Sequence, residues 1–185
     1  TSIFMREGAS YYIWHADSEG HNFRSALINA GLKLTQCLVW VKNSMVMGRQ
    51  DYQWKHEPVL YGWKPGAAHK WYSDRKQTTI LEFDRPIRNA EHPTMKPLDL
   101  CEYLMSNSAK RGQNVYDGFC GSGTTLIASE KLKMNCYAQE LGPEYVDVIV
   151  RRYVGYMNDN ELLFKITRNG EELSNVAIDE YFKEG

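Results

Sequence analysis

The sequence predicts an α/β fold built around a parallel sheet. Between residues 114 and 140, a strand, a glycine-rich turn, a helix and a second strand follow one another, which is the order of a βαβ unit. The first 63 residues contain short runs rich in Val, Tyr and Trp, which are typical of strands, and one segment of helical periodicity. The length of 185 residues suits one domain, with room for an appendage.

Four elements are expected in the first part of the chain. The first strand is aromatic and β-prone, and the following helix, with apolar residues at helical spacing, ends at Gly31. Two further strands complete this part. In order, the four elements span residues 11–15, 23–30, 34–41 and 58–63.

Residues 64–89 contain Gly, Pro and charge without clear periodicity, so we interpret them as an irregular, surface-exposed insert. Regular elements then return as helix, strand, helix, strand and helix, with prolines able to start the first and last helices. These elements span residues 97–105, 114–117, 124–132, 136–140 and 143–156. Asn169-Gly170, between apolar runs at 162–166 and 176–178, predicts a terminal hairpin.

Composition excludes several classes of protein. No apolar run approaches the roughly 20 residues of a membrane-spanning helix, and the N-terminus lacks the apolar core of a signal peptide. The four cysteines are widely spaced without a C-x-x-C pair, so neither a disulfide framework nor a zinc site is expected. His15 and His21 make no convincing metal pair, and no metal is expected. A reducing cytoplasm is the default location, here of a bacterial or phage-infected cell.

Charge is unevenly distributed although the net charge is −1. Residues 42–88 contain nine Lys and Arg against five Asp and Glu, whereas residues 156–185 contain three against seven. A solvated surface explains both stretches as well as a binding surface does.

The most informative stretch is Asp117-Gly118-Phe119-Cys120-Gly121-Ser122-Gly123-Thr124-Thr125. A Walker phosphate loop needs Lys after its last Gly, where Thr124 stands. A G-x-G-x-x-G dinucleotide fingerprint starting at Gly121 fails because Leu126 takes the third glycine position. Neither template therefore applies.

The placement of this stretch, after a strand and before a helix, still suits a nucleotide-like ligand. Gly121 and Gly123 allow close approach of the backbone, and the helix start offers free N–H groups. Asp117 can accept from an ammonium group, and Glu140, at the end of the next strand, can bind both hydroxyls of a ribose. An adenosine-bearing ligand with an amino-acid tail would use all of these features.

This stretch resembles the D-x-F-x-G-S-G-T-T motif of amino-directed DNA methyltransferases, which bind S-adenosyl-L-methionine. About twenty residues upstream, His92-Pro93-Thr94-Met95-Lys96-Pro97 is similar to their H-P-T-x-K-P motif. The resemblance covers residues 11–153 and is strongest to enzymes of phages and prophages. Gly118 departs from the usual Pro, and Cys120 from the usual small residue, for which we expect a packing role.

The resemblance implies a β-type adenine-N6 or cytosine-N4 DNA methyltransferase of restriction–modification systems, acting on double-stranded DNA. It implies a Rossmann-like fold, permuted so that the catalytic half precedes the cofactor half. The implied cofactor-binding residues are His92, Pro93, Thr94, Lys96, Pro97, Asp117, Phe119, Gly121, Ser122, Gly123, Thr124, Thr125 and Glu140. More ordinary interpretations remain: a helix start for His92 and Lys96, a turn cap for Asp117 and a surface charge for Glu140.

The expected organisation has four parts. They are the second half of a catalytic subdomain, a target-recognition insert, a cofactor-binding subdomain and an acidic C-terminal hairpin or tail. Their ranges are 1–63, 64–91, 92–156 and 157–185.

The catalytic tetrapeptide [D/N/S]-P-P-[Y/F/W] of these enzymes is absent, because no two of the six prolines are adjacent. In the β-type order it would lie some tens of residues before Thr1, which indicates a piece of a longer chain. We therefore expect no catalytic residue here, no activity of this chain alone, and an interrupted sheet. The N-terminal part of the same protein, or a second copy, would supply the rest.

DNA contacts are expected in or near the insert, where the family places target recognition. The candidates are Lys55, Lys64, Lys70, Trp71, Arg75, Lys76, Arg85 and Arg88. Trp40 and Trp63 are assigned to the core, whereas Trp54 and Trp71 suit either the core or base stacking.

Two other classes of function stay open. The chain can be a non-catalytic cofactor-binding or DNA-binding module that has lost its catalytic segment. It can also belong to an RNA or small-molecule methyltransferase on the same fold, although the order of segments resembles the DNA enzymes.

Overall fold

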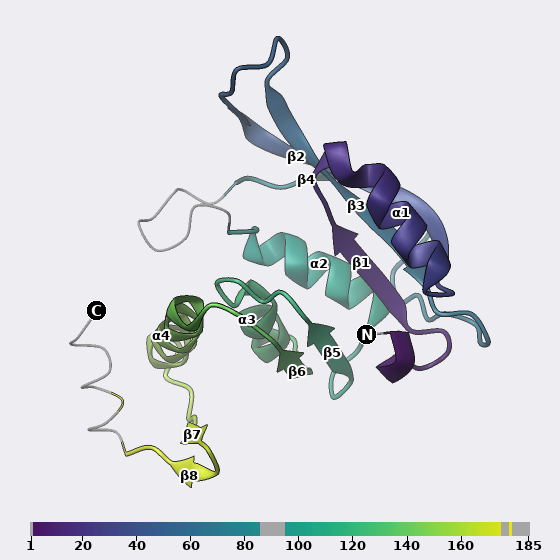
Figure 1. Ribbon diagram of the computed structural model, residues 1–185. Coiled ribbons are helices and arrows are strands. Elements are labelled where there is room, and N and C mark those ends of the chain that lie inside the picture. Colours follow the sequence, from purple (N-terminus) through teal and green to yellow (C-terminus); the bar gives the residue numbers. More distant parts are fainter. Residues whose placement is uncertain (1, 86–94, 175–177, 179–185) are drawn as a thin grey trace.

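A computed structural model describes residues 2–85, 95–174 and 178 of the chain. Its larger sheet has four strands in the order β1-β3-β2-β4 (Figure 1). β3 pairs antiparallel with β1 and β2, and β4 pairs parallel with β2. The strands are β1 (Ser10–Trp14), β2 (Lys33–Val46), β3 (Trp54–Trp63) and β4 (Ile80–Glu82). Short 3-10 turns lie at Ser2–Phe4 and Asp17–Glu19.

Both faces of this sheet are buried, because successive residues of a strand point to opposite sides. Val59 and Tyr61 of β3 pack on one face with Leu100 and Leu104 of helix α2 (Leu98–Ser108). Leu60, between them in sequence, packs on the other face with Leu27 of helix α1 (Gly20–Asn29). The sheet is therefore held between α1 and α2 (Figure 1).

The second sheet is the predicted βαβ unit. β5 (Asn114–Asp117) and β6 (Asn135–Ala138) pair in parallel, and helix α3 (Thr124–Lys131) connects them. α3 packs on α2 and β6 and also contacts helix α4 (Pro143–Asp159). These elements match their predicted positions within a few residues.

The two sheets are not joined within the described residues. β1 pairs on one side with β3, and β5 pairs with β6, but no backbone ladder connects β1 to β5. Figure 1 shows the two strands apart, with α2 beside both. The interrupted sheet that the missing tetrapeptide predicts is thus observed.

The parallel pairing expected from the βαβ pattern holds for β5–β6, whereas β3 pairs antiparallel with β1 and β2, for which no direction was predicted. β2 and β3 follow one another directly, and such a hairpin connection makes an antiparallel pair. Both strands are also longer than predicted, and residues 43–53 form the outer part of an arm that projects from the sheet (Figure 1).

The insert differs from its predicted form as well. β4 lies within it and was not predicted, because a three-residue strand has too little periodicity to detect. Part of the insert packs onto the sheet: His69 stacks on Trp63 at 3.8 Å between ring centroids, and the Tyr72 N–H donates to the Asn107 carbonyl at 2.8 Å. Residues 86–94 lie outside the described residues.

The terminal hairpin is centred where predicted, at Asn169 and Gly170, both at positive φ. Its strands, β7 (Thr167–Arg168) and β8 (Glu171–Glu172), are however only two residues long. The predicted first strand at 162–166 is wrong, and part of the second, at 176–178, falls outside the described residues. Among the helices that the structure describes, none has the length and apolar character needed to cross a membrane.

Candidate functional site

The glycine-rich turn joins the carboxyl end of β5 to the start of α3. Gly121 and Gly123 have φ of 55° and 82°, in the left-handed region that disfavours side chains. A Cβ at Gly123 would also lie 3.1 Å from the Ile149 side chain of α4. The two glycines thus fold the turn tightly and direct the N-terminus of α3 toward its open side.

Two carboxylates bind the backbone of this turn. One Asp117 oxygen accepts from the Phe119 N–H at 3.0 Å. Glu140, after β6, accepts from the N–H groups of Gly121 at 2.7 Å, Leu141 at 2.8 Å and Gly142 at 2.9 Å. Glu140 therefore connects the turn to the beginning of α4, and the surface charge that was its alternative interpretation does not describe it.

The remaining predicted residues of the turn divide into inward and outward groups. Ser122 and Thr124 are buried, and the Ser122 carbonyl accepts from Arg152. The Thr125 carbonyl accepts from Ser129 Oγ at 2.7 Å within α3. The Phe119 side chain, in contrast, is 95% exposed. Ser122 and Thr124 offer mainly their backbone to a ligand, whereas Phe119 offers its ring.

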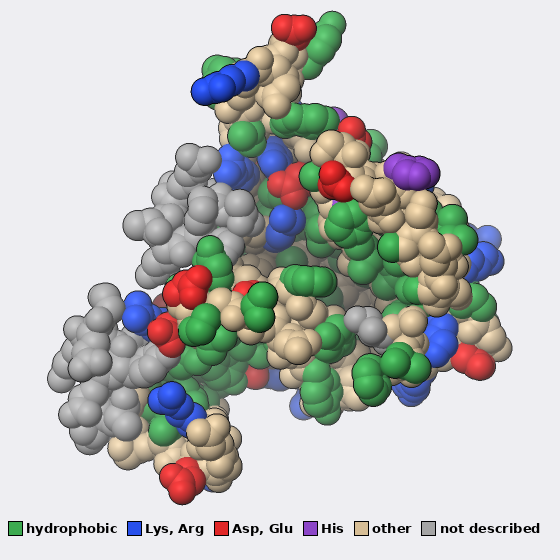
Figure 2. Space-filling view, viewed as in Figure 1, with side chains coloured by type: hydrophobic (Ala, Val, Ile, Leu, Met, Phe, Trp, Pro, Cys, Tyr) green, Lys and Arg blue, Asp and Glu red, His purple; other side chains and the backbone are tan. Residues whose placement is uncertain are grey.

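A charged cluster joins β2 and β3 to Lys96, which lies two residues before α2. Lys96 Nζ lies 3.0 Å from one oxygen of Glu57 and 5.2 Å from the centroid of the Trp14 ring. The other Glu57 oxygen lies 2.8 Å from Nζ of Lys42, whose side chain is only 7% exposed. Figure 2 shows charged side chains of both signs meeting at the base of the β2–β3 arm, beside a hollow.

The cations decide the charge state of Glu57. Burial alone would raise the pKa of this carboxyl, but Lys96 and Lys42 outweigh it, so the pKa is lowered. Glu57 is therefore ionised at neutral pH and shared by two lysines. Neither Lys42 nor Glu57 was predicted as a site residue; the available signal was charge at both positions next to apolar strand residues.

Cysteines show that α2 and the turn are neighbours. Burial raises the pKa of the Cys101 thiol on α2 to about 12, and the charge of Asp117 adds to this effect while Lys96 opposes it. The Cys120 thiol in the turn also has a pKa of about 12, mainly through burial. A buried, neutral thiol at Cys120 agrees with the expected packing role.

Some predicted cofactor residues lie outside the described residues, namely His92, Pro93 and Thr94. Pro97 is buried and precedes the first residue of α2. Lys96 and Pro97 of the H-P-T-x-K-P motif thus precede α2, whose Cys101 lies within reach of the charges of both Lys96 and Asp117.

The predicted DNA-binding residues occupy two ends of the larger sheet. Lys55 is on the β2–β3 arm, and the Arg85 N–H donates to Asn43 at the base of that arm, 3.2 Å away. Four others lie on residues 64–79, beyond the Trp63 end of β3: Lys70, Trp71, Arg75 and Lys76. Glu57 and Trp63 are six residues apart on β3, which is about 20 Å of strand.

Lys64 differs from the rest of this group. Its Nζ donates to the carbonyls of Ser2 at 3.0 Å and Met5 at 2.9 Å, so it holds the N-terminal turn against the end of β3. Arg88 lies outside the described residues. The seven candidates that lie within the described residues therefore do not form one continuous patch.

A parallel βαβ unit with a glycine turn, an acidic residue at the end of the first strand and another just after the second is the arrangement of the cofactor half of a Rossmann-like methyltransferase fold. Comparison with known sequences gives the family. Residues 5–151 match the N6/N4 methyltransferase family, described as DNA methylase, and the chain belongs to that family.

Individual relatives agree with this assignment. The chain is 27% identical over 170 residues to the type II methyltransferase M.BglI of Bacillus subtilis, covering 82% of this chain and 45% of that protein. It is 38% identical over 103 residues to M2.MboI of Moraxella bovis, covering 54% of this chain and 38% of that protein. The chain thus corresponds to less than half the length of these two relatives.

Solved structures share the fold. The M1.HpyAVI–SAM complex superposes with a TM-score of 0.71 at 24% identity, covering 80% of this chain and 76% of that one. The cytosine-N4-specific PvuII DNA methyltransferase gives 0.67 at 17% identity, covering 97% and 70%.

Proposed function

We propose that this chain forms the cofactor-binding and DNA-recognition part of an S-adenosylmethionine-dependent DNA methyltransferase that modifies adenine N6 or cytosine N4. The observation that carries the proposal is the turn after β5, with positive-φ glycines, Asp117 and Glu140, in a chain of the DNA methylase family. A relative of the same fold is solved with SAM.

The residues fit such a cofactor. Gly121 and Gly123 leave no side chain over the helix start, where free N–H groups favour polar or anionic ligand groups. Asp117 uses one oxygen for the Phe119 N–H, and its other oxygen can accept from an ammonium. S-adenosylmethionine supplies an electrophilic methyl group when it is bound.

Glu140 already accepts three backbone N–H groups, and a carboxylate offers about four acceptor sites. A ribose diol that binds Glu140 would therefore compete with these bonds. We expect bound cofactor to compete with the Gly121 N–H, since that bond connects Glu140 to the turn itself.

The DNA substrate requires more than this cofactor site. A base inside a duplex must leave the stack before its exocyclic amine can reach the methyl group, and that amine is a weak nucleophile. Catalysis therefore consists mostly of positioning and electrostatic stabilisation. No tetrapeptide with adjacent prolines is present in the sequence to accept the N–H bonds of the amine.

The missing group belongs between β1 and β5. Both strands have a side that pairs with no other strand in the described part of the chain, and buried backbone groups need partners. A strand bearing the tetrapeptide, from another part of the same protein or a second copy, would complete the sheet. The 185 residues alone are then inactive and work in the cytoplasm as part of that larger assembly.

Calorimetry with S-adenosylhomocysteine tests the cofactor assignment. Binding is expected for the chain, and Asp117→Ala should weaken it about tenfold or more, because a hydrogen bond to a charged group contributes about 1.5–3 kcal/mol. Asp51→Ala, on the exposed part of the arm, is the matched control and should bind normally. Equal affinity of Asp117→Ala and the chain would reject the assigned role.

A methyl-transfer assay with tritiated S-adenosylmethionine tests whether the chain is inactive by itself. The purified chain is expected to transfer no label to double-stranded DNA, and transfer would disprove the proposed inactivity. Reading the coding sequence upstream of Thr1 separates an enzyme part, which predicts a D-P-P-Y-like tetrapeptide there, from a module that has lost catalysis.

A further inference from the structure

A pocket lies on the α2 face of the larger sheet, at the end remote from the glycine-rich turn. Its volume is about 220 Å³, which exceeds the roughly 150 Å³ of a protein cavity known to hold benzene. β2, β3, α2 and residues 69–79 contribute to its walls. It has room for a single or fused planar ring.

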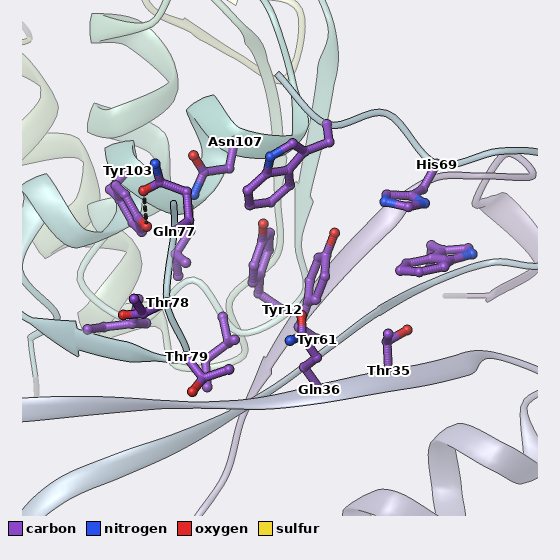
Figure 3. Close-up of a pocket in the computed structure, with 15 residues that line it drawn as sticks. Tyr12, Thr35, Gln36, Tyr61, His69, Gln77, Thr78, Thr79, Tyr103 and Asn107 are labelled. Carbon is purple, nitrogen blue, oxygen red and sulfur yellow. Dashed lines mark hydrogen bonds between the residues drawn. The ribbon is translucent and has the colours of Figure 1, made fainter. Parts of the chain in front are cut away.

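Aromatic side chains form much of the pocket wall. Tyr12 and Tyr61 stack at 5.0 Å between centroids, and Figure 3 shows the two rings side by side. The Trp71 ring lies 6.4 Å from Tyr61, and Trp63 carries the stacked His69. Flat aromatic faces favour a flat aromatic ligand.

The polar groups of the wall are neutral amides and hydroxyls, apart from His69. None of the fifteen lining residues is Asp, Glu, Lys or Arg. The Tyr61 hydroxyl is buried and has no hydrogen-bond partner within the described part of the chain, although the Ser10 and Ser108 side chains lie near it. Burial raises the pKa of Tyr61, so this group stays a neutral donor at neutral pH.

Asn107 adds a second available group. Only 3% of it is exposed, and its side-chain oxygen accepts from Ser73 Oγ. Its amide nitrogen makes no hydrogen bond among the residues that the structure describes. Two nearly buried polar groups therefore face a neutral, ring-lined pocket, which suits the polar edge of a heteroaromatic ring.

Cationic side chains surround this neutral pocket. Lys33 Nζ lies 4.7 Å from the centroid of the Trp63 ring, and Lys110 Nζ lies 4.6 Å from that of Tyr72. Exposed Lys70, Arg75 and Lys76 follow on the same segment as Trp71. Asp74, the acidic residue of that segment, accepts from Gln77 at 2.6 Å and from the Lys76 N–H at 2.9 Å.

We propose that this pocket binds one nucleobase outside a duplex, with the surrounding cations contacting the phosphates on either side of it. Tyr61 and Trp63, the β3 residues that line the pocket, lie four and six residues from Glu57, about 13 and 20 Å along the strand, so the bound base is distinct from a base held at the Lys96–Glu57 cluster. That the base comes from a DNA strand rests on the proposed function. That the pocket binds a nucleobase rests only on the side chains that line it.

Tryptophan fluorescence of the purified chain tests the proposal, because Trp63 and Trp71 line the pocket. Nucleosides should give a saturable change, and a single-stranded tetranucleotide should bind more tightly. Oligonucleotide affinity should fall roughly tenfold between 50 and 200 mM salt, as two or three phosphate contacts predict. Nucleoside affinity should not depend on salt.

Trp71→Ala should weaken both ligands about fivefold or more through loss of stacking. Trp54→Ala, on the arm outside the pocket, is the matched control and should leave nucleoside affinity unchanged. Tyr61→Phe keeps the ring and should weaken binding about two- to tenfold through loss of one hydroxyl. Unchanged thermal unfolding and S-adenosylhomocysteine binding would show that each variant is folded.

If nucleosides bind and oligonucleotides do not, the result supports a base-binding pocket and identifies its ligand as a free nucleoside. The proposal is overturned if no nucleoside or oligonucleotide binds saturably, or if Trp71→Ala and Trp54→Ala lose nucleoside affinity equally. Loss of S-adenosylhomocysteine binding by Asp117→Ala, measured separately, tests the proposed function and leaves this result unaffected.

Discussion

The two sheets of this protein differ in how completely they are covered. In the larger sheet, Val59 and Leu60 of β3 are fully buried, one on each face. In the smaller sheet, paired residues Tyr116 and Tyr137 are 52% and 59% exposed. The larger sheet is thus a complete core, whereas the sheet that holds the candidate cofactor turn has one uncovered face. The larger sheet therefore provides most of the buried core, whereas the smaller sheet holds the candidate cofactor site.

Leu60→Ala tests this difference most directly. Removing a fully buried Leu leaves a cavity between β3 and α1, so the free energy of unfolding should fall by about 2–5 kcal/mol. Tyr137→Ser, on the uncovered face, should change it by less than about 0.5 kcal/mol. Urea unfolding followed by circular dichroism measures both. Similar losses would show that the smaller sheet is as well packed as the larger one.

Glu57→Gln tests the ion cluster between the two parts. It leaves buried Lys42 without a carboxylate, and we expect a loss of roughly 1–3 kcal/mol at pH 7. Because the pKa of folded Glu57 is lowered, its stabilising effect is complete above the unfolded value of 4.5 and is lost as pH falls through the folded value. Unfolding measured from pH 7 to pH 3 should show the variant and the chain converge in acid. A constant difference would mean that the charge of Glu57 contributes nothing.

Gly123→Ala tests the smaller sheet through its turn. An alanine at φ 82° costs about 1–2 kcal/mol and also meets Ile149. Gly112→Ala has a similar φ of 78° with no atom within 4 Å, so it provides the strain without the crowding. Both variants should lose stability, but only Gly123→Ala should also lose S-adenosylhomocysteine affinity by calorimetry. If the two variants bind S-adenosylhomocysteine with equal affinity, the turn does not take part in binding this ligand.

Lys55→Gln and Lys64→Gln should have the smallest and most selective effects. Lys55 is exposed on the arm, so its loss should leave stability within about 0.5 kcal/mol and reduce the salt slope of DNA binding by about one. Lys64 binds two carbonyls of the N-terminal turn, so its loss should lower stability by about 1 kcal/mol without changing the slope. Filter binding across salt concentrations distinguishes them, and an unchanged slope for Lys55→Gln would remove it from the DNA surface.

Local patterns predicted the smaller sheet well. The turn and helix α3 follow from neighbouring residues such as Asp117 and Gly123, and they form where predicted. The larger sheet was less predictable because its features depend on distant partners. β4 forms because it pairs with β2 at Val39. Glu57 belongs to the ion cluster because it pairs with Lys42 and Lys96, which are 15 and 39 residues away in sequence. The pocket likewise arises where residues 69–79 fold back over β3.

One side of β1 pairs with no strand among the residues that the structure describes, and this edge has a consequence for how the proposed partner strand would be recognised. An added strand would bind through main-chain N–H and C=O groups, which are the same for every sequence except at proline. Affinity would then come from the backbone, and selectivity from the few side chains beside it. Such an edge also invites self-association, so the isolated chain should show concentration-dependent aggregation that a complementary β-strand peptide suppresses.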